Sequence, residues 1–330
     1  MLKRLATTMM FSLMALPATA ACVGDSYLDQ LSEAERADLA AATAEIPYGK
    51  GLLWTATKGE DTATIAGTMH IYDPRLEPIR AKIKDQVQSA DLVMVEATLD
   101  DQKTLQEMIV TQPDLLFITE GPTLPDLVDE ETWEMIADAS TARSIPGFMA
   151  AKMQPWYLSL MLSIPPCAME NMIQGQLGLD HMVMEDAQAA GVPLKALEPV
   201  TTLFEIFEDE PIDDQIAMLL VNLLAPETLQ QLHVAMLDNY FTGDIATLWE
   251  MTRIAMNDMP GITPDEAADL FAKTEEGLLN ERNRNWMPVI NAAFEEHDNV
   301  VIAAGAAHLI GEQGILQFLE NDGWTVTPLQ

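Results

Sequence analysis

The segment Val300-Val301-Ile302-Ala303-Ala304-Gly305-Ala306-Ala307-His308 is an uninterrupted apolar run that leads into Gly-x-x-His. Such a run is typical of a strand buried on both faces of a sheet. A second copy of the arrangement occurs early in the chain, where Thr62 to Ala66 leads into Gly67-Thr68-Met69-His70. In each copy the glycine allows a sharp turn off the strand and close approach to whatever lies above it.

Two further strand candidates end in a carboxylate. The run from Asp91 to Val95 ends in Glu96, and a weaker run from Val192 to Leu197 ends in Glu198. Ligands of open sheets with helical crossovers bind beyond the carboxyl ends of the strands. We therefore expect both histidines and both glutamates to converge on one crevice.

The rest of the chain predicts an α/β (α+β) fold, a central mixed sheet flanked by helices. Residues 52–57 and 62–66 flank a turn and predict a hairpin, and residues 324–327 predict a last strand. Expected helices cover 78–89, 180–190 and 264–296, where Thr263 is the N-cap of one long helix or two. The stretches at about 100–180 and 200–260 are expected to be large helical insertions, the first with about four helices and the second with three.

The crevice residues favour metal chemistry. Two imidazoles and a carboxylate are common ligands of a divalent ion that keeps positions open for water and substrate. Such an ion lowers the pKa of bound water and polarises a carbonyl. The alternative is that each Gly-x-x-His is a chance pattern or a capping histidine, because one copy alone is a weak signal.

The first twenty residues predict a secretory signal peptide. Lys3 and Arg4 precede an apolar stretch, and a small-x-small pattern ends at Ala20, after which we expect cleavage. The stretch is shorter than the roughly 20 residues that a membrane anchor needs. Residues 21–330 are then expected to form a single periplasmic or secreted domain without a transmembrane segment. Cys22, just after the predicted cut, leaves lipidation as an alternative.

The two cysteines gain meaning from this predicted export. In an oxidising compartment Cys22 and Cys167 are candidates for a disulfide bond. A free nucleophilic thiol at Cys167 is the alternative. Two cysteines are too few for a four-cysteine zinc site.

Charge excludes another class of function. The chain has 17 Lys+Arg against 52 Asp+Glu, and its formal net charge is -35. A chain this acidic repels a phosphate backbone, so we expect no nucleic-acid partner.

Together these motifs resemble the TraB/GumN family, which also contains the Tiki metalloproteases. The resemblance runs from about residue 50 to the end of the chain, and its motifs are Gly67 to His70, Val95-Glu96-Ala97, Gly178-Leu179-Asp180, Leu197-Glu198, Glu281-Arg282-Asn283, Val301 to Gly311, Gly314 and Gly323 to Val326. Ala97-Thr98 is a departure, because the Tiki branch has leucine and aspartate there.

The resemblance implies an exported metal-dependent hydrolase, peptidase-like, that acts on a peptide or on a small ester or amide. His70, His308 and Glu96 would bind a divalent ion such as Mn, Co or Zn, with Glu96 as ligand or general base. Arg282 would stabilise the developing oxyanion, with a structural ion pair as the alternative. Glu198 would be a further metal ligand or would contact one of the ligands. The alternative is that Glu198 is a helix cap before Pro199. A periplasmic haem- or metal-binding protein without turnover is the rival function.

Other residues are interpreted more simply. Asp180 is expected to be a helix cap, and His233 and His297 are expected at the surface. His181 and Glu185 have metal-ligand spacing on a helix, but a solvated contact is the simpler interpretation. A methionine-rich middle section predicts core packing or an adaptable groove rather than copper binding.

Overall fold

The computed structural model describes residues 22–208, 210–223, 226–257 and 263–329. The predicted signal peptide lies outside these residues. Within them, no helix is both long enough and apolar enough to cross a bilayer.

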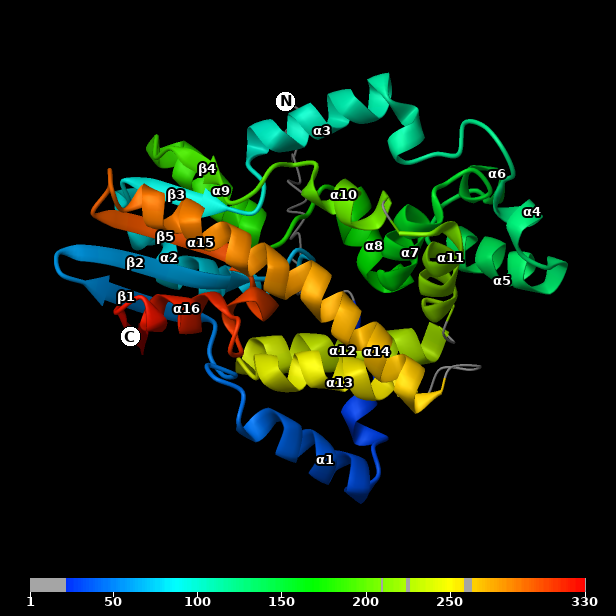
Figure 1. Ribbon diagram of the computed structural model, residues 1–330, viewed down its shortest axis with the longest axis horizontal. Helices are drawn as coiled ribbons and strands as arrows, with labels where there is room; N and C mark the ends of the chain where they lie inside the picture. Colours follow the sequence, from blue (N-terminus) through cyan, green and yellow to red (C-terminus); the bar gives the residue numbers. More distant parts are fainter. Residues whose placement is uncertain (1–21, 209, 224–225, 258–262, 330) are drawn as a thin grey trace, which may run out of the picture.

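A six-stranded mixed sheet forms the centre of the molecule, in the order β4-β3-β5-β2-β1-β6 (Figure 1). β2, β3, β4 and β5 are parallel, β1 is antiparallel to β2, and β6 is antiparallel to β1. The predicted α/β fold with a mixed sheet is therefore confirmed. The strands are β1 Leu53–Lys58, β2 Asp61–Thr68, β3 Leu92–Val95, β4 Leu194–Ala196, β5 Asn299–Gly305 and β6 Thr325–Pro328.

Helices cover both faces of this sheet. Figure 1 shows α15 and α16 in front of the strands and α2 and α9 behind them. Burial on both faces explains the unbroken apolar sequence of β3, all four residues of which are buried. These four helices are α2 Leu76–Ser89, α9 Leu179–Ala190, α15 Glu281–Ala293 and α16 Ile315–Asn321.

The first insertion contains more helices than expected. Four were expected between residues 102 and 164, and prolines divide this stretch into shorter pieces. The elements of this stretch are α3 Leu99–Thr111, the 3₁₀ turn η2 Pro113–Leu115, α4 Leu124–Leu127, α5 Glu130–Thr141, α6 Gly147–Ala150 and α7 Pro155–Ser163. Helix α8 Pro166–Ile173 follows directly after it.

Among the described residues of the second insertion there are four helices where three were expected. They begin or end at Pro211, Pro226 and Gly243, which are the predicted breaks. They are α10 Thr202–Glu208, α11 Ile212–Val221, α12 Pro226–Thr242 and α13 Ile245–Asn257.

The long C-terminal helix is interrupted. α14 Pro264–Glu275 begins with a capping box at Thr263, which confirms the predicted N-cap. A π-helical turn, η3 Glu276–Asn280, then separates α14 from α15. Single π turns inside α-helices occur frequently at functional sites.

An N-terminal arm precedes the sheet. It consists of the 3₁₀ turn η1 Tyr27–Asp29 and α1 Glu33–Ala44, neither of which was expected from the sequence. α1 packs on α13 through Leu39, next to Met251 and Ile254. A disulfide between Cys22 and Cys167 joins this arm to α8, as predicted. Both sulfurs are therefore engaged, which argues against lipidation of Cys22 and against a free thiol nucleophile at Cys167.

Most of the methionine-rich middle section lies in the interior, in line with the core interpretation. Met153, Met169, Met182 and Met184 are buried, whereas Met149 is 41% exposed.

Candidate functional site

The predicted site residues lie together at the carboxyl ends of four parallel strands. His70 follows β2, Glu96 follows β3 and Glu198 follows β4. His308 lies on the 3₁₀ turn η4 Ala306–Leu309 directly after β5. Arg282, from the first turn of α15, completes the cluster. Strand order brings His70, Glu96 and His308 together, since β3 and β2 are the two neighbours of β5.

Arg282 lies at the centre of the cluster and is 6% exposed. Its Nη2 donates to Oε2 of Glu96 at 2.7 Å and to Oε1 of Glu198 at 2.5 Å. Its Nε donates to both oxygens of Glu198 at 3.1 Å, and the indole N–H of Trp286 donates to Oε2 at 2.9 Å. Glu198 is therefore an anchor for Arg282 and Trp286, not a cap before Pro199.

His308 is buried and its orientation is set by Asn283. The amide nitrogen of Asn283 donates to the main-chain oxygens of His308 and Gln313, so its Oδ1 accepts from Nδ1 of His308 at 2.7 Å. This leaves Nε2 of His308 as an acceptor, which faces Nη1 of Arg282 at 3.3 Å. The ring also packs against Trp286, with centroids 4.3 Å apart.

His70 is the exposed member of the cluster, with 62% of its side chain open to solvent. Its Nδ1 lies 3.3 Å from Oδ1 of Asp180, and its Nε2 lies 4.0 Å from Oε1 of Glu96. The prediction that Asp180 is a helix cap was wrong. Gly178 is the N-cap residue of α9, and the Asp180 carboxylate faces the imidazole instead.

The start of α9 is fastened to the end of β2. The N–H groups of Gly178 and Leu179 donate to the main-chain oxygens of His70 and Met69 at 3.0 and 2.9 Å. A Cβ at Gly178 would lie 1.9 Å from the Met69 oxygen, so only glycine fits this approach. The Gly178-Leu179-Asp180 motif thus places Asp180 against His70.

Gly305 has a related use. Its N–H donates to Oε1 of Glu96 at 2.7 Å, and a Cβ there would lie 3.3 Å from the same oxygen. Its φ is -48°, so the glycine serves close approach to the carboxylate and not a left-handed turn.

The local charges separate the protonation states of the two histidines. Partial burial disfavours a charged His70, but the carboxylates of Asp180 and Glu96 outweigh it and raise the pKa of His70 to about 9. Burial lowers the pKa of His308 to about 4. His70 is then charged at neutral pH and His308 is neutral.

Glu96 stays ionised in this setting. Its burial opposes ionisation, but the neighbouring His308, His70 and Arg282 outweigh it and lower the pKa of Glu96 to about 2. Because His308 is neutral at pH 7, the charges that act on Glu96 there are those of His70 and Arg282.

The fit of a divalent ion differs among the four predicted ligands. Nε2 of His70 and Oε1 of Glu96 lie 4.0 Å apart, and Oδ1 of Asp180 lies 3.3 Å from Nδ1 of the imidazole without a hydrogen bond. His308 and Glu198 do not fit, because Arg282 engages both. Among the described residues no group of three or more His, Cys, Asp and Glu side chains is arranged to hold a metal.

The other histidines, to which the sequence analysis gave no role in the site, differ in where they lie. His233 is 6% exposed, so the expectation that it lies at the surface was wrong. His297 is partly exposed. His181 lies 3.7 Å from Glu185 without a third ligand among the described residues, as a simple contact would.

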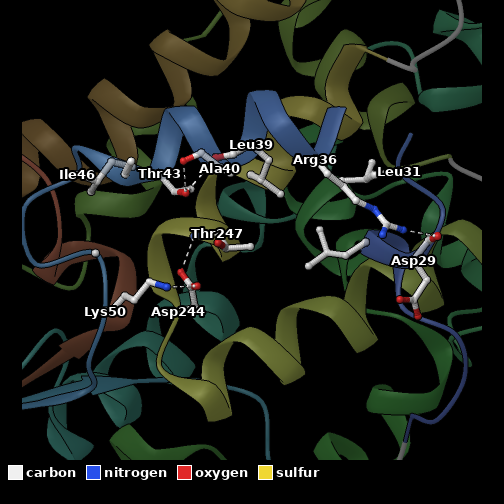
Figure 2. Close-up of a pocket in the computed structure, with 13 residues that line it drawn as sticks. Asp29, Leu31, Arg36, Leu39, Ala40, Thr43, Ile46, Lys50, Asp244 and Thr247 are labelled. Carbon is white, nitrogen blue, oxygen red and sulfur yellow. Dashed lines mark hydrogen bonds and ion pairs between the residues drawn. The ribbon is translucent and has the colours of Figure 1, made fainter. Parts of the chain in front are cut away.

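A cavity of about 820 Å³ lies away from this cluster, beneath α1 (Figure 2). Leu31, Leu39 and Ile46 contribute to its apolar wall. Lys50 pairs with Asp244 at 2.9 Å, and Arg36 donates to the Asp29 main-chain oxygen. Both cations thus have partners within the protein, and we assign no ligand to the cavity.

Comparison with known proteins agrees with the motifs. No curated protein sequence matches the chain. The model of the TraB/PrgY/gumN family matches residues 52–328, which include all six strands of the sheet and all five site residues. The chain belongs to the TraB/PrgY/gumN family.

Proposed function

We propose that the mature chain is an exported hydrolase that cleaves peptide bonds or small esters and amides at this cluster. The observation that supports it most is the setting of His70. Its imidazole is open to solvent, while Asp180 and Glu96 lie on either side of the ring. The other four residues are largely buried and held by hydrogen bonds, so His70 is the acid–base group of the cluster that meets solvent.

The proposed roles follow from the charges. His70, with a pKa of about 9, carries a proton on Nε2 at neutral pH and donates it to the substrate carbonyl or leaving group. Glu96 is ionised, and its Oε1 orients the attacking water. Arg282 holds Glu96 in place through Nη2. Its predicted role at the oxyanion stays a prediction, because its nitrogens already contact Glu96, Glu198, His308 and Leu278.

The divalent ion stays part of this proposal on the strength of the family resemblance. His70, deprotonated at Nε2, and Glu96 are the residues that would hold it in place of the His70 proton, and Mn, Co and Zn are the candidates. When bound, it would supply Lewis acidity and a water of lowered pKa.

Export is proposed from two features. The sequence has a predicted signal peptide, and the Cys22–Cys167 disulfide suits an oxidising compartment. A periplasmic or secreted location follows from the two together.

The rival function is haem or metal binding without turnover. It needs the histidines but gives no role to the paired Glu96 and Arg282. One experiment separates the two functions. The purified mature chain is analysed for bound metals by mass spectrometry and assayed on peptide and ester panels with Mn, Co, Zn or a chelator.

His70→Ala, His308→Ala and Glu96→Gln are measured in parallel, with His297→Ala as the matched control. We expect His70→Ala and Glu96→Gln to lower turnover by about 10²-fold or more, as loss of groups that donate a proton or orient water does. His308→Ala should lower turnover less, because it removes only a contact of Arg282, and His297→Ala should leave it unchanged. Turnover that survives all three changes would refute the proposed site. Metal that is bound, and lost with the histidines, without any cleavage would favour the rival.

A further inference from the structure

Three main-chain oxygens of the segment that carries His70 accept hydrogen bonds from helices. Two of them, those of Met69 and His70, accept from the start of α9. The third, that of Gly67, accepts at 2.9 Å from the hydroxyl of Tyr240. Tyr240 lies on α12, 173 residues further along the chain. The second insertion therefore reaches the first Gly-x-x-His motif without supplying a member of the cluster.

The hydrogen bond from Tyr240 is shielded from water. Its side chain is 1% exposed and belongs to the apolar core that surrounds the sheet. Burial raises the pKa of Tyr240, and the negative charge of Asp180 adds to the rise, so the hydroxyl keeps its proton and donates it to Gly67. A buried oxygen that loses its donor destabilises the fold, so this bond holds Gly67 in a defined place.

Gly67 lies where the sheet meets the cluster. In β2 it precedes Thr68, which is paired with Gly305 of β5. The N–H of Gly305 donates to Oε1 of Glu96. A hydrogen bond to Gly67 therefore holds the end of β2 beside the main-chain group that binds Glu96, and His70 follows three residues later.

α12 also contacts the chain on the other side of His70. The guanidinium carbon of Arg75 lies 4.1 Å from the ring centroid of Phe241, and Nη1 lies 3.6 Å from Oδ1 of Asp238. The same guanidinium donates to both oxygens of the buried Asp73, at 2.9 and 3.0 Å. α12 thus contacts the chain both before and after His70.

We propose that Tyr240 is a positioning residue of the cluster, whose hydrogen bond to Gly67 keeps the exposed imidazole of His70 in place beside Glu96. With 62% of its side chain open to solvent, the imidazole has few neighbours of its own, so its place depends on the main chain that carries it. The inference rests on the proposed function only for its kinetic consequence. It gives the second insertion a part in the site.

Tyr240→Phe tests this, because it removes the hydroxyl and keeps the buried ring. The first measurement is the NMR spectrum of the chain labelled with ¹³C-histidine, in which the Cε1 signal of His70 is identified by its loss in His70→Ala. We expect this signal to move in Tyr240→Phe, while the signal of the distant residue His297 stays in place.

The second measurement is the kinetics on a cleaved peptide or ester. We expect kcat of Tyr240→Phe to fall about tenfold, because a small displacement of a group that transfers a proton slows the chemical step. KM should change little. Tyr48→Phe is the matched control, since it also loses a hydroxyl hydrogen bond, but that bond joins the loop before β1 to Glu320 on α16. Both variants are measured at a temperature at which circular dichroism shows them fully folded, so a loss of stability alone moves neither result.

The outcomes separate this inference from the proposed function. An unmoved His70 signal in Tyr240→Phe would overturn the inference, and so would an unchanged kcat. Equal changes in Tyr240→Phe and Tyr48→Phe would overturn it as well, because they would mark a general loosening of the fold. If the native chain cleaves no substrate, the proposed function fails, and the His70 signal alone then decides whether Tyr240 positions the imidazole.

Discussion

At the scale of single residues, the charge of His70 depends on carboxylates supplied by distant segments. Asp180 comes from α9 and Glu96 from the end of β3. Both raise the pKa of His70, and Asp180 is the stronger of the two. The protonation state of the exposed imidazole is therefore a property of the fold, since the ordinary pKa of histidine would leave it mostly neutral at pH 7.

Asp180→Asn should lower the pKa of His70 by at least one unit, because the carboxamide no longer stabilises the imidazolium. The measurement is an NMR titration of the histidine Cε1 signals. Glu185→Gln, an exposed change on the same helix, is the control and should leave the titration unchanged. An unaltered pKa in Asp180→Asn would mean that Glu96 alone holds the proton.

His233 makes a second prediction at this scale. Burial lowers the pKa of His233 to about 4 from 6.5, so between these values the unfolded chain binds a proton that the folded chain does not. The stabilising contribution of the neutral ring is complete above pH 6.5 and is lost as the pH falls toward 4. At 1.36 kcal/mol for each pKa unit, the loss is roughly 3 kcal/mol.

Urea unfolding of the native chain and of His233→Leu between pH 4.5 and 7.5 measures this loss. The free energy of unfolding of the native chain should fall more steeply with acid than that of the variant. Parallel pH profiles would show that His233 is protonated in the folded state as well.

At the scale of elements, the junction between β2 and α9 carries the site. Gly178 lets the helix start lie directly on the main chain of Met69 and His70. Gly178→Ala should lower the free energy of unfolding by about 3 kcal/mol, because overpacked backbone has to move apart. It should also reduce activity, since Asp180 and His70 would separate.

Gly147→Ala provides the matched control for this change. A Cβ at Gly147 meets only the Ala137 methyl at 3.9 Å, so the free energy of unfolding of Gly147→Ala should stay within about 0.5 kcal/mol of that of the native chain. Equal midpoints for Gly178→Ala and Gly147→Ala would contradict the junction described here.

The helices and strands differ in how far the sequence predicts them. The strands were predictable because apolar runs such as Leu92 to Val95 have no other stable place than a covered sheet. The strand-end positions of His70, Glu96 and His308 followed from the same rule. α1 was missed although its alanine content and the Ser32–Glu35 capping box favour a helix, because its one buried leucine, Leu39, gives it no apolar stripe.

Other site features depend on contacts that no local pattern encodes. The pairing of Asp180 with His70, the Asn283 amide beneath His308 and the π turn before Arg282 all join or reshape separate segments. His233 was misplaced for the same reason. Its sequence neighbours are partly polar, yet α12 is packed on enough sides to bury His233, Val234 and Ala235 together.

At the scale of the whole molecule, the disulfide closes a very long loop. Cys22 and Cys167 are 145 residues apart, and the arm that carries Cys22 precedes the part matched by the family. Replacing both cysteines with serine should lower the free energy of unfolding by roughly 5 kcal/mol in the chain-entropy model. Denaturant unfolding of the oxidised chain and of the double variant measures the difference.

Reduced native chain should behave like the double variant in that experiment. Identical midpoints for the oxidised and reduced chains would show that the arm is held by α12 and α13 without its covalent link.

The two outer strands of the sheet have a consequence for the behaviour of the protein at high concentration. β4 has three residues and presents the exposed Lys195, while β6 ends at Pro328, which has no N–H to donate. Short strands, lysine and proline at an edge all discourage pairing with the strand of another molecule. The sheet thus offers little template for edge-to-edge aggregation, and self-association through its open sides is expected to be weak.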